Sequence, residues 1–148
     1  MKILVINGCN INMIGIREPE LYGTATYADL TDMINKHAKE KGLTVEVWQS
    51  NHEGDIVDKI QQSYKEIDGI IINAGAYTHT SVAILDALKA VSIPTVEVHI
   101  TDPDLREDFR KVNFIRPAAT ETVKGHGLKG YIEAMDILAD ILRNKGID

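Results

Sequence analysis

The sequence predicts an α/β fold, a three-layer sandwich in which helices cover both faces of a five-stranded parallel sheet. Two observations support this prediction: short runs rich in β-branched residues recur along the 148 residues, and helical patterns separate them. A third is that no linker, internal repeat or low-complexity segment interrupts the alternation. Residues 1–148 are therefore expected to form a single domain with one core.

The expected elements follow one another in a regular order. Strand-like runs bounded by turn residues lie at Lys2–Ile6, Thr44–Trp48, Gly69–Asn73, Thr95–Ile100 and, more weakly, Glu121–Lys124. Helical patterns span Tyr27–Lys41, Asp55–Ile67, Ser81–Val91, a short Leu105–Lys111, and Leu128–Lys145. Ser81 is placed to cap its helix, and Gly42 and Gly146 stand where helices stop. Five strands joined in this way favour the flavodoxin-like order 2-1-3-4-5.

Composition and charge narrow the class of protein. No apolar run approaches the roughly 18 residues of a membrane span, and the first apolar run follows Met1-Lys2 directly, without the segments of a signal peptide. The single cysteine, Cys9, cannot form an internal disulfide. We therefore expect a cytoplasmic protein. The net charge of −6 and the scattered basic residues argue against nucleic acid as a partner.

Unusual polar residues gather where the strands end. In sheets of this order the binding crevice lies beyond the carboxyl ends of the strands, where strand order reverses. The segment Asn7–Gly23 follows the first strand and is far longer than the roughly two to six residues of an ordinary connection. Other polar segments follow the later strands, at Ser50–Glu53, Asn73–Thr80 and His99–Asp102. We expect the functional site at this edge.

Several kinds of site are disfavoured by the motifs. The glycines after the first strand fit neither G-x-G-x-x-G nor a P-loop, and Asn73 stands where a receiver domain would need aspartate. Histidines and glutamates could suggest a metal, but no H-x-x-x-H or H-E-x-x-H pattern brings two ligands to one helix face. The motifs therefore disfavour a nucleotide cofactor and leave metal binding as a minor alternative.

Two pairs of residues suit acid–base chemistry. Glu97 and His99 lie two apart on a predicted strand, so their side chains point to the same side, and the carboxylate could orient the imidazole as a general acid. Arg17 and Tyr22 lie five apart in the long segment, and a guanidinium can lower the pKa of a phenol. A satisfied polar pair and a packed tyrosine are the structural alternatives.

Anion binding is the third feature of this edge. Asn73, His79 and the helix start at Thr80-Ser81 are expected near the crevice, where free backbone N–H groups favour anions. Capping by Ser81 alone could explain part of this stretch. Arg106 and Arg110 lie four apart on one face of the predicted short helix, where either could pair with Glu107 or Asp108, or one could reach a substrate.

Taken together, these motifs resemble the type II 3-dehydroquinate dehydratases, enzymes of the shikimate and quinate pathways. The resemblance covers nearly the whole chain through six stretches: NGCNINMIGIREPELYG, QSNHEGD, IINAGAYTHTSVAILDAL, VEVHIT, REDFR and GHGLKGYIEAM. It implies trans elimination of water from 3-dehydroquinate through an enolate, without cofactor or metal. It also implies trimers that assemble into a homododecamer.

The resemblance implies a role for each matched residue. Tyr22 would remove the proton next to the ketone, Arg17 would lower its pKa, and Asn10 would hold a water at the enolate oxygen. His99, oriented by Glu97, would protonate the departing hydroxyl. The substrate-binding residues would be Asn73 and the backbone amides of Ile100 and Thr101 for the carboxylate, and His79, Arg110 and a neighbouring subunit's Asp86 for the ring hydroxyls.

Three positions depart from the family's usual pattern. Cys9 replaces a proline, and Thr101-Asp102 replaces Ser-Asn. Asp102 would weaken substrate binding modestly if its charge faced the crevice. Two other classes of function are weighed against the dehydratase: a flavodoxin-like binding module without turnover, which retention of Tyr22, Arg17 and His99 argues against, and a metal-dependent hydrolase, which would lose activity with a chelator.

Overall fold

A five-stranded parallel sheet forms the centre of the protein in the computed structural model, which describes residues 1–21 and 23–148. The strands are β1 (Lys2–Asn7), β2 (Thr44–Gln49), β3 (Gly69–Asn73), β4 (Thr95–His99) and β5 (Glu121–Lys124). Their order is β2-β1-β3-β4-β5, and every neighbouring pair is parallel. This confirms the predicted fold class and strand order.

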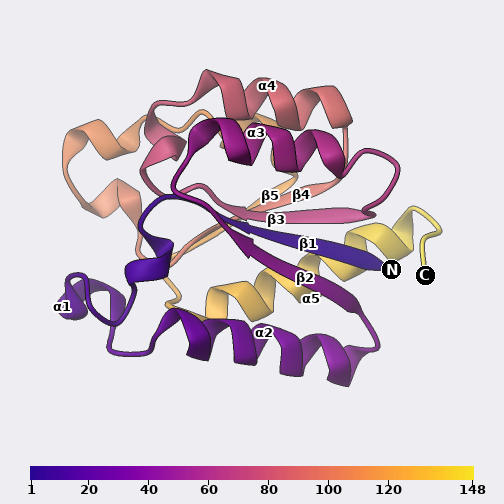
Figure 1. Cartoon of the computed structure of the whole chain (residues 1–148), viewed down its shortest axis with the longest axis horizontal. Helices are drawn as coiled ribbons and strands as arrows, with labels where there is room; N and C mark the ends of the chain where they lie inside the picture. Colours follow the sequence, from indigo (N-terminus) through magenta and orange to yellow (C-terminus); the bar gives the residue numbers. More distant parts are fainter.

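Helices cover both faces of the sheet (Figure 1). Helices α2 (Tyr27–Lys41) and α5 (Lys129–Asn144) lie on one face, and α3 (Glu53–Gln62) and α4 (Val82–Val91) lie on the other. The terminal amino group of Met1 donates a hydrogen bond to the Asp148 carbonyl oxygen at 2.8 Å, so the two ends of the chain meet. Among the described residues, no helix has both the length and the apolar character needed to cross a membrane.

Side chains along each strand point alternately to the two faces of the sheet, so the core has two layers. Ile3 and Val5 of β1 pack on the side of α2 and α5, whereas Leu4 and Ile6 pack on the side of α3 and α4. These four side chains are at most 1% exposed. Because odd-numbered residues of β1 point toward α2 and α5, the side chain of Asn7 at the strand end continues that row.

The helix boundaries agree with the capping residues. The Ser81 hydroxyl accepts a hydrogen bond from the Ile84 N–H at 3.0 Å at the start of α4, and Gly42 ends α2 in a left-handed conformation. Helix α3 ends at Gln62 rather than at the expected Ile67, because the chain turns through a left-handed Lys65 (φ 65°).

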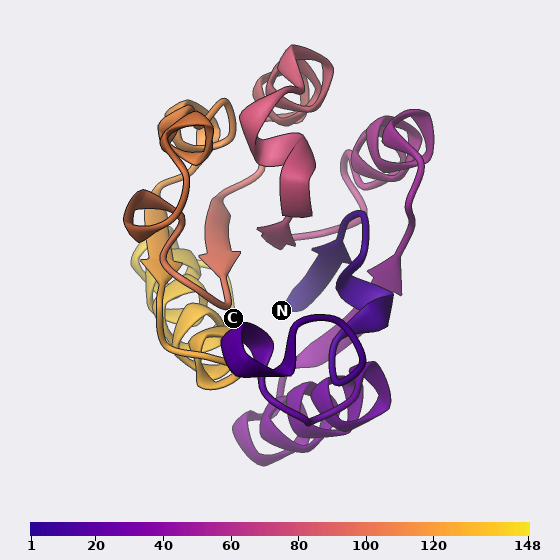
Figure 2. The ribbon, with the colours of Figure 1, turned by 90° about the vertical axis from the view of Figure 1, so that its left-hand side faces the viewer.

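The predicted helix at residues 105–111 is wrong. The chain forms two short 3-10 helices there, η3 (Pro103–Leu105) and η4 (Asp108–Lys111), with Arg106 and Glu107 extended between them. Four further short helices of the described chain were not predicted: η1 (Ile11–Met13), α1 (Pro19–Tyr22), η2 (Gly75–His79) and η5 (Arg116–Ala118). Most of these short elements lie in the connections that follow the strands, and Figure 2 views the molecule from that edge.

Candidate active site

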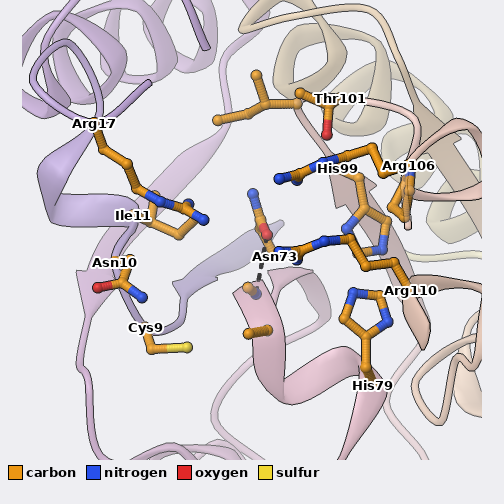
Figure 3. Close-up of a pocket in the computed structure, with 14 residues that line it drawn as sticks. Cys9, Asn10, Ile11, Arg17, Asn73, His79, His99, Thr101, Arg106 and Arg110 are labelled. Carbon is orange, nitrogen blue, oxygen red and sulfur yellow. Dashed lines mark hydrogen bonds between the residues drawn. The ribbon is translucent and has the colours of Figure 1, made fainter. Parts of the chain in front are cut away.

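A pocket of about 470 Å³, its open mouth included, lies beyond the carboxyl ends of β1, β3 and β4. This is the edge where the sequence predicts the site, at the carboxyl ends of the strands. Figure 3 shows the side chains that enter it. The pocket is lined by Cys9, Asn10, Ile11, Arg17, Asn73, Gly75, Ala76, His79, His99, Ile100, Thr101, Pro103, Arg106 and Arg110.

Two glycines allow the connections after β1 and β3 to pack against each other. A Cβ atom on Gly8 would lie 2.3 Å from the Ala74 carbonyl oxygen, and one on Gly75 would lie 2.5 Å from the Cys9 carbonyl oxygen. Gly75 also has a positive φ of 63°, which side chains disfavour. The half-buried Cys9 therefore lies in a close backbone contact that forms the floor of the pocket.

Residues after β2 hold the turn that contains Asn10. The Asn51 carboxamide oxygen accepts hydrogen bonds from the Asn10 N–H at 3.0 Å and from Gln49 Nε2 at 3.1 Å. Gln49 also donates to the Gly8 carbonyl at 3.2 Å. Asn10 itself is left-handed and exposed, and its side chain borders the pocket. The residues at and after the end of β2 thus hold the connection that follows β1. His52 is not among the described residues that line the pocket.

His99 and Glu97 form a buried pair in the wall of the pocket. His99 Nε2 donates to Glu97 Oε2 at 2.9 Å, and the two side chains are 7% and 0% exposed. Since a carboxylate only accepts, Nε2 carries a proton and Nδ1 is the nitrogen left for the pocket. The two side chains are therefore hydrogen-bonded, and the role of the carboxylate in orienting the imidazole stays a prediction.

Three further groups hold the Glu97 carboxylate. Asn113 Nδ2 donates to both carboxylate oxygens, at 3.1 and 2.8 Å, and the Thr122 hydroxyl donates to Oε1 at 2.9 Å. Arg116 Nε lies 3.8 Å from Oε1. Burial favours the neutral acid, but the hydrogen bonds from His99, Asn113 and Thr122 outweigh it, so the pKa of Glu97 is lowered below its usual 4.5. Glu97 is therefore an anion that lies in direct contact with the imidazole of His99.

His79 presents a defined face to the pocket. Its Nδ1 lies 2.7 Å from the Val112 carbonyl oxygen, which can only accept, so Nδ1 carries the proton. In the neutral ring Nε2 is then an acceptor. This arrangement suits a hydroxyl group of a ligand.

Three arginines give the pocket a positive charge. Arg17 enters from the connection after β1, and Arg106 and Arg110 enter from the segment after β4 (Figure 3). Arg110 Nε donates to Glu107 Oε2 at 2.6 Å, and Arg17 and Arg106 both lie near Glu18, with nitrogen–oxygen distances of 3.9 and 3.8 Å. Among the described residues that line the pocket none is acidic, so an anionic ligand is favoured although the chain is acidic overall.

The loops after β4 and β5 are joined where Ile100 and Thr101 face the pocket. The Gly127 N–H donates to the Ile100 carbonyl at 3.0 Å, and the Gly125 N–H donates to the Thr101 carbonyl at 3.1 Å. Gly125 adopts a positive φ of 79° to do so. The carbonyl groups of Ile100 and Thr101 are therefore held by the loop after β5.

Asp102 does not face the pocket. Its carboxylate accepts from the Asp104 N–H at 3.0 Å and lies 3.4 Å from Lys124 Nζ, and Lys124 also pairs with Asp104. Asp102 would weaken substrate binding only if its charge faced the crevice, and it does not face it. The helix start at Ser81 is likewise occupied by its own cap and does not line the pocket.

Two expected site residues stand apart from this pocket. Asp86 is exposed on α4 and does not line it. The prediction for Tyr22 lies outside the described residues. Within the described part of the chain, no three His, Cys, Asp or Glu side chains are grouped as a metal ion would require.

Several residues that hold the side chains of the site by hydrogen bonds were not indicated by the sequence. Asn113 and Thr122 hold Glu97, and Tyr131 of α5 contacts Asn73. Tyr131 lies within the GHGLKGYIEAM stretch, but its position is also that of an ordinary core residue of an amphipathic helix. Its partners Asn7 and Asn73 are far away in the sequence, so no local pattern around Tyr131 indicates these hydrogen bonds.

The fold and the pocket define a class: a flavodoxin-like α/β protein with a cationic small-molecule site that contains a carboxylate–histidine pair. The family model described as dehydroquinase class II matches residues 1–139, and the chain belongs to this family. The chain is 54% identical over 142 residues to a 3-dehydroquinate dehydratase of Caldicellulosiruptor bescii, covering 95% of this chain and 98% of that protein.

Crystal structures of type II dehydroquinases are also similar to the structure of this chain. The type II dehydroquinase from Butyrivibrio crossotus superposes with a TM-score of 0.93 at 53% identity, covering 94% of this chain and 97% of that one. The type II dehydroquinase from Propionibacterium acnes has a TM-score of 0.90 at 40% identity, with coverage of 94% and 96%. The fold predicted from the sequence is the fold of these relatives.

Proposed function

We propose that this protein is a type II 3-dehydroquinate dehydratase, a hydro-lyase that converts 3-dehydroquinate to 3-dehydroshikimate by trans elimination of water through an enolate. The observation that carries the proposal is the buried Glu97–His99 pair in the wall of a cationic pocket. Membership of the class II dehydroquinase family supports the same assignment. Residues 1–148 would act as a single catalytic domain in the cytoplasm, without cofactor.

Substrate binding would use the polar groups already described. The carboxylate of 3-dehydroquinate would bind the Asn73 carboxamide and the backbone amides of Ile100 and Thr101. The ring hydroxyls would bind His79, whose Nε2 is free to accept in the neutral ring, and Arg110, whose Nε is held by Glu107. The charge of the arginines favours binding of the anion.

Proton removal would come first. Tyr22, as phenolate, would take the proton from the carbon next to the ketone, and the electron pair would move onto the ketone oxygen. Arg17 lines the pocket and would both lower the pKa of the phenol and stabilise the developing charge. Asn10 would hold a water that donates to the enolate oxygen.

Loss of hydroxide would complete the reaction. The enolate would re-form the ketone while the carbon–oxygen bond breaks, and His99 would donate its Nδ1 proton to the departing oxygen, which leaves as water. Glu97 would stabilise the imidazolium before the transfer and hold its orientation during it. Tyr22 would then release its proton to solvent, and His99 would take up a proton from solvent, which restores the starting state.

The absorbance of the conjugated enone product tests the proposal directly. The purified protein is expected to produce a rise in ultraviolet absorbance when 3-dehydroquinate is added. Tyr22→Phe and His99→Ala should each lose nearly all of this activity while still binding the product. Binding of 3-dehydroquinate without any rise in absorbance would instead indicate a binding module, and activity lost only on adding a chelator would indicate a metal-dependent hydrolase.

A homododecamer built from trimers would complete the site. Asp86 would reach the pocket of a neighbouring subunit and bind a ring hydroxyl there. Asp86 shares a face of α4 with Val82, four residues earlier, which is 49% exposed despite its apolar side chain. Phe109 and Val112 are also exposed, at 64% and 49%. These apolar side chains are suited to burial between subunits, and sedimentation would give the number of subunits.

A further inference from the structure

A buried tyrosine joins the ends of two neighbouring strands. Asn7 and Asn73 are register partners at the carboxyl ends of β1 and β3, and both point toward α5. The Tyr131 hydroxyl of α5 lies between them, 2.7 Å from Asn7 Oδ1 and 2.9 Å from Asn73 Nδ2. Tyr131 and Asn7 are fully buried, and Asn73 is 3% exposed.

The backbone N–H of Gly75 determines the direction of the hydrogen bonds that link Asn73, Tyr131 and Asn7. The Gly75 N–H can only donate, and it donates to Asn73 Oδ1 at 3.1 Å, the bond drawn in Figure 3. The other end of the Asn73 carboxamide must therefore be its NH2 group, which donates to the Tyr131 oxygen. The Tyr131 hydrogen then points to Asn7 Oδ1.

This order decides what Asn73 presents to the pocket. One hydrogen of the Asn73 NH2 is used on Tyr131, and the second remains for a ligand at the pocket wall. A flipped carboxamide would place its NH2 against the Gly75 N–H and its oxygen toward the ligand. An oxygen there would repel a carboxylate, whereas an N–H attracts it.

We propose that Tyr131 is a positioning residue that holds the carboxamide of Asn73 with an N–H directed at the ligand's carboxylate. This inference rests on the proposed function, in which Asn73 binds the carboxylate of 3-dehydroquinate. Tyr131 and Asn7 act through Asn73 and do not touch the substrate.

The surroundings of Tyr131 keep it suited to this role. Burial raises the pKa of the Tyr131 phenol well above its usual value, although the hydrogen bond from Asn73 partly opposes this effect. The phenol therefore stays protonated and continues to donate to Asn7 across the working pH range. Asn7 Nδ2 is buried without a partner among the described residues, so the orientation in which the Asn7 oxygen accepts from Tyr131 leaves one buried donor unsatisfied.

Tyr131→Phe tests the proposal because it removes only the hydroxyl. Without the hydroxyl, the Asn73 carboxamide loses one of the two hydrogen bonds that fix it and is held by the Gly75 N–H alone, so the KM for 3-dehydroquinate should rise about threefold to tenfold while kcat changes less. Tyr27→Phe is the matched control: Tyr27 packs against the same core and makes no hydrogen bond with Asn73. That variant should keep the wild-type KM.

A ligand without the carboxylate separates positioning from general loosening of the core. In the wild type, inhibition constants should differ strongly between the product and a ring ketone that lacks the carboxylate. In Tyr131→Phe this difference should shrink, because only the carboxylate contact is weakened. An equal loss for both ligands, or an unchanged KM, would overturn the inference. A wild-type protein with no dehydratase activity would instead reject the proposed function, before any variant is compared.

Discussion

His99 Nε2 donates to Glu97 Oε2 at 2.9 Å, and the carboxylate that receives this bond is completely buried. Asn113 and Thr122 satisfy the remaining acceptor positions of that carboxylate. A buried anion is costly unless it is hydrogen-bonded and paired with a positive charge. The arrangement therefore places the imidazole beside an anionic carboxylate, and Nδ1 is the ring nitrogen left for the pocket.

Replacing Glu97 with glutamine should reduce turnover more than binding. The substitution keeps the size of the side chain but removes the carboxylate charge that the proposed mechanism uses to stabilise an imidazolium, so kcat should fall about tenfold to a hundredfold, within the range of general-acid contributions. KM should change less than about threefold, a small effect on the free-energy scale of binding. Steady-state kinetics measured by enone absorbance would check this, and an unchanged kcat would show that Glu97 does not assist His99.

The same substitution should change the response of stability to acid. The pKa of Glu97 is lowered in the folded protein, so its contribution to the free energy of unfolding is complete above the unfolded value of about 4.5 and is lost as pH falls through the lower folded value. The advantage of the wild type over Glu97→Gln should therefore shrink below pH 4.5. Urea unfolding of both proteins at pH 7, 5 and 4 would measure it. A constant difference at all three values would contradict the lowered pKa.

Asp102→Asn should leave substrate binding almost unchanged. Asp102 faces Lys124 and accepts from the Asp104 N–H, a bond that asparagine can also accept. We expect less than a twofold change in KM and a loss of about 0–1 kcal/mol in stability, as for other exposed ion pairs. Kinetics and thermal unfolding would test both. A KM that fell severalfold would show that the charge of Asp102 is felt by the substrate.

Mixing two inactive variants would reveal a site shared between subunits. Asp86→Ala and His99→Ala should each be impaired when assembled alone. If Asp86 acts in a neighbour's pocket, an Asp86→Ala subunit beside a His99→Ala subunit forms one intact site, and unfolding and refolding the mixture should restore activity. Refolding each variant separately provides the control. A mixture no more active than its components would place Asp86 outside any shared site.

The sequence predicted the helices and strands closely where periodicity and capping acted together. Ser81 and Gly42 marked helix ends that the structure confirms, whereas the helical pattern of residues 105–111 does not form one continuous helix. There the backbone of Arg106 and Glu107 is extended, and both Arg106 and Arg110 still line the pocket. The catalytic and binding roles assigned to the site residues remain predictions.

By itself the sequence determined the sheet, the edge that carries the site and the pairing of Glu97 with His99, because all three follow from local patterns of period two or 3.6 and from the rule for parallel sheets. Only the tertiary structure decided which groups hold those side chains. Tyr131 reaches Asn7 across 124 positions and Asn73 across 58, and Thr122 reaches Glu97 across 25. Hydrogen bonds require contact within about 3 Å and a defined direction, and both depend on how helices dock on the sheet.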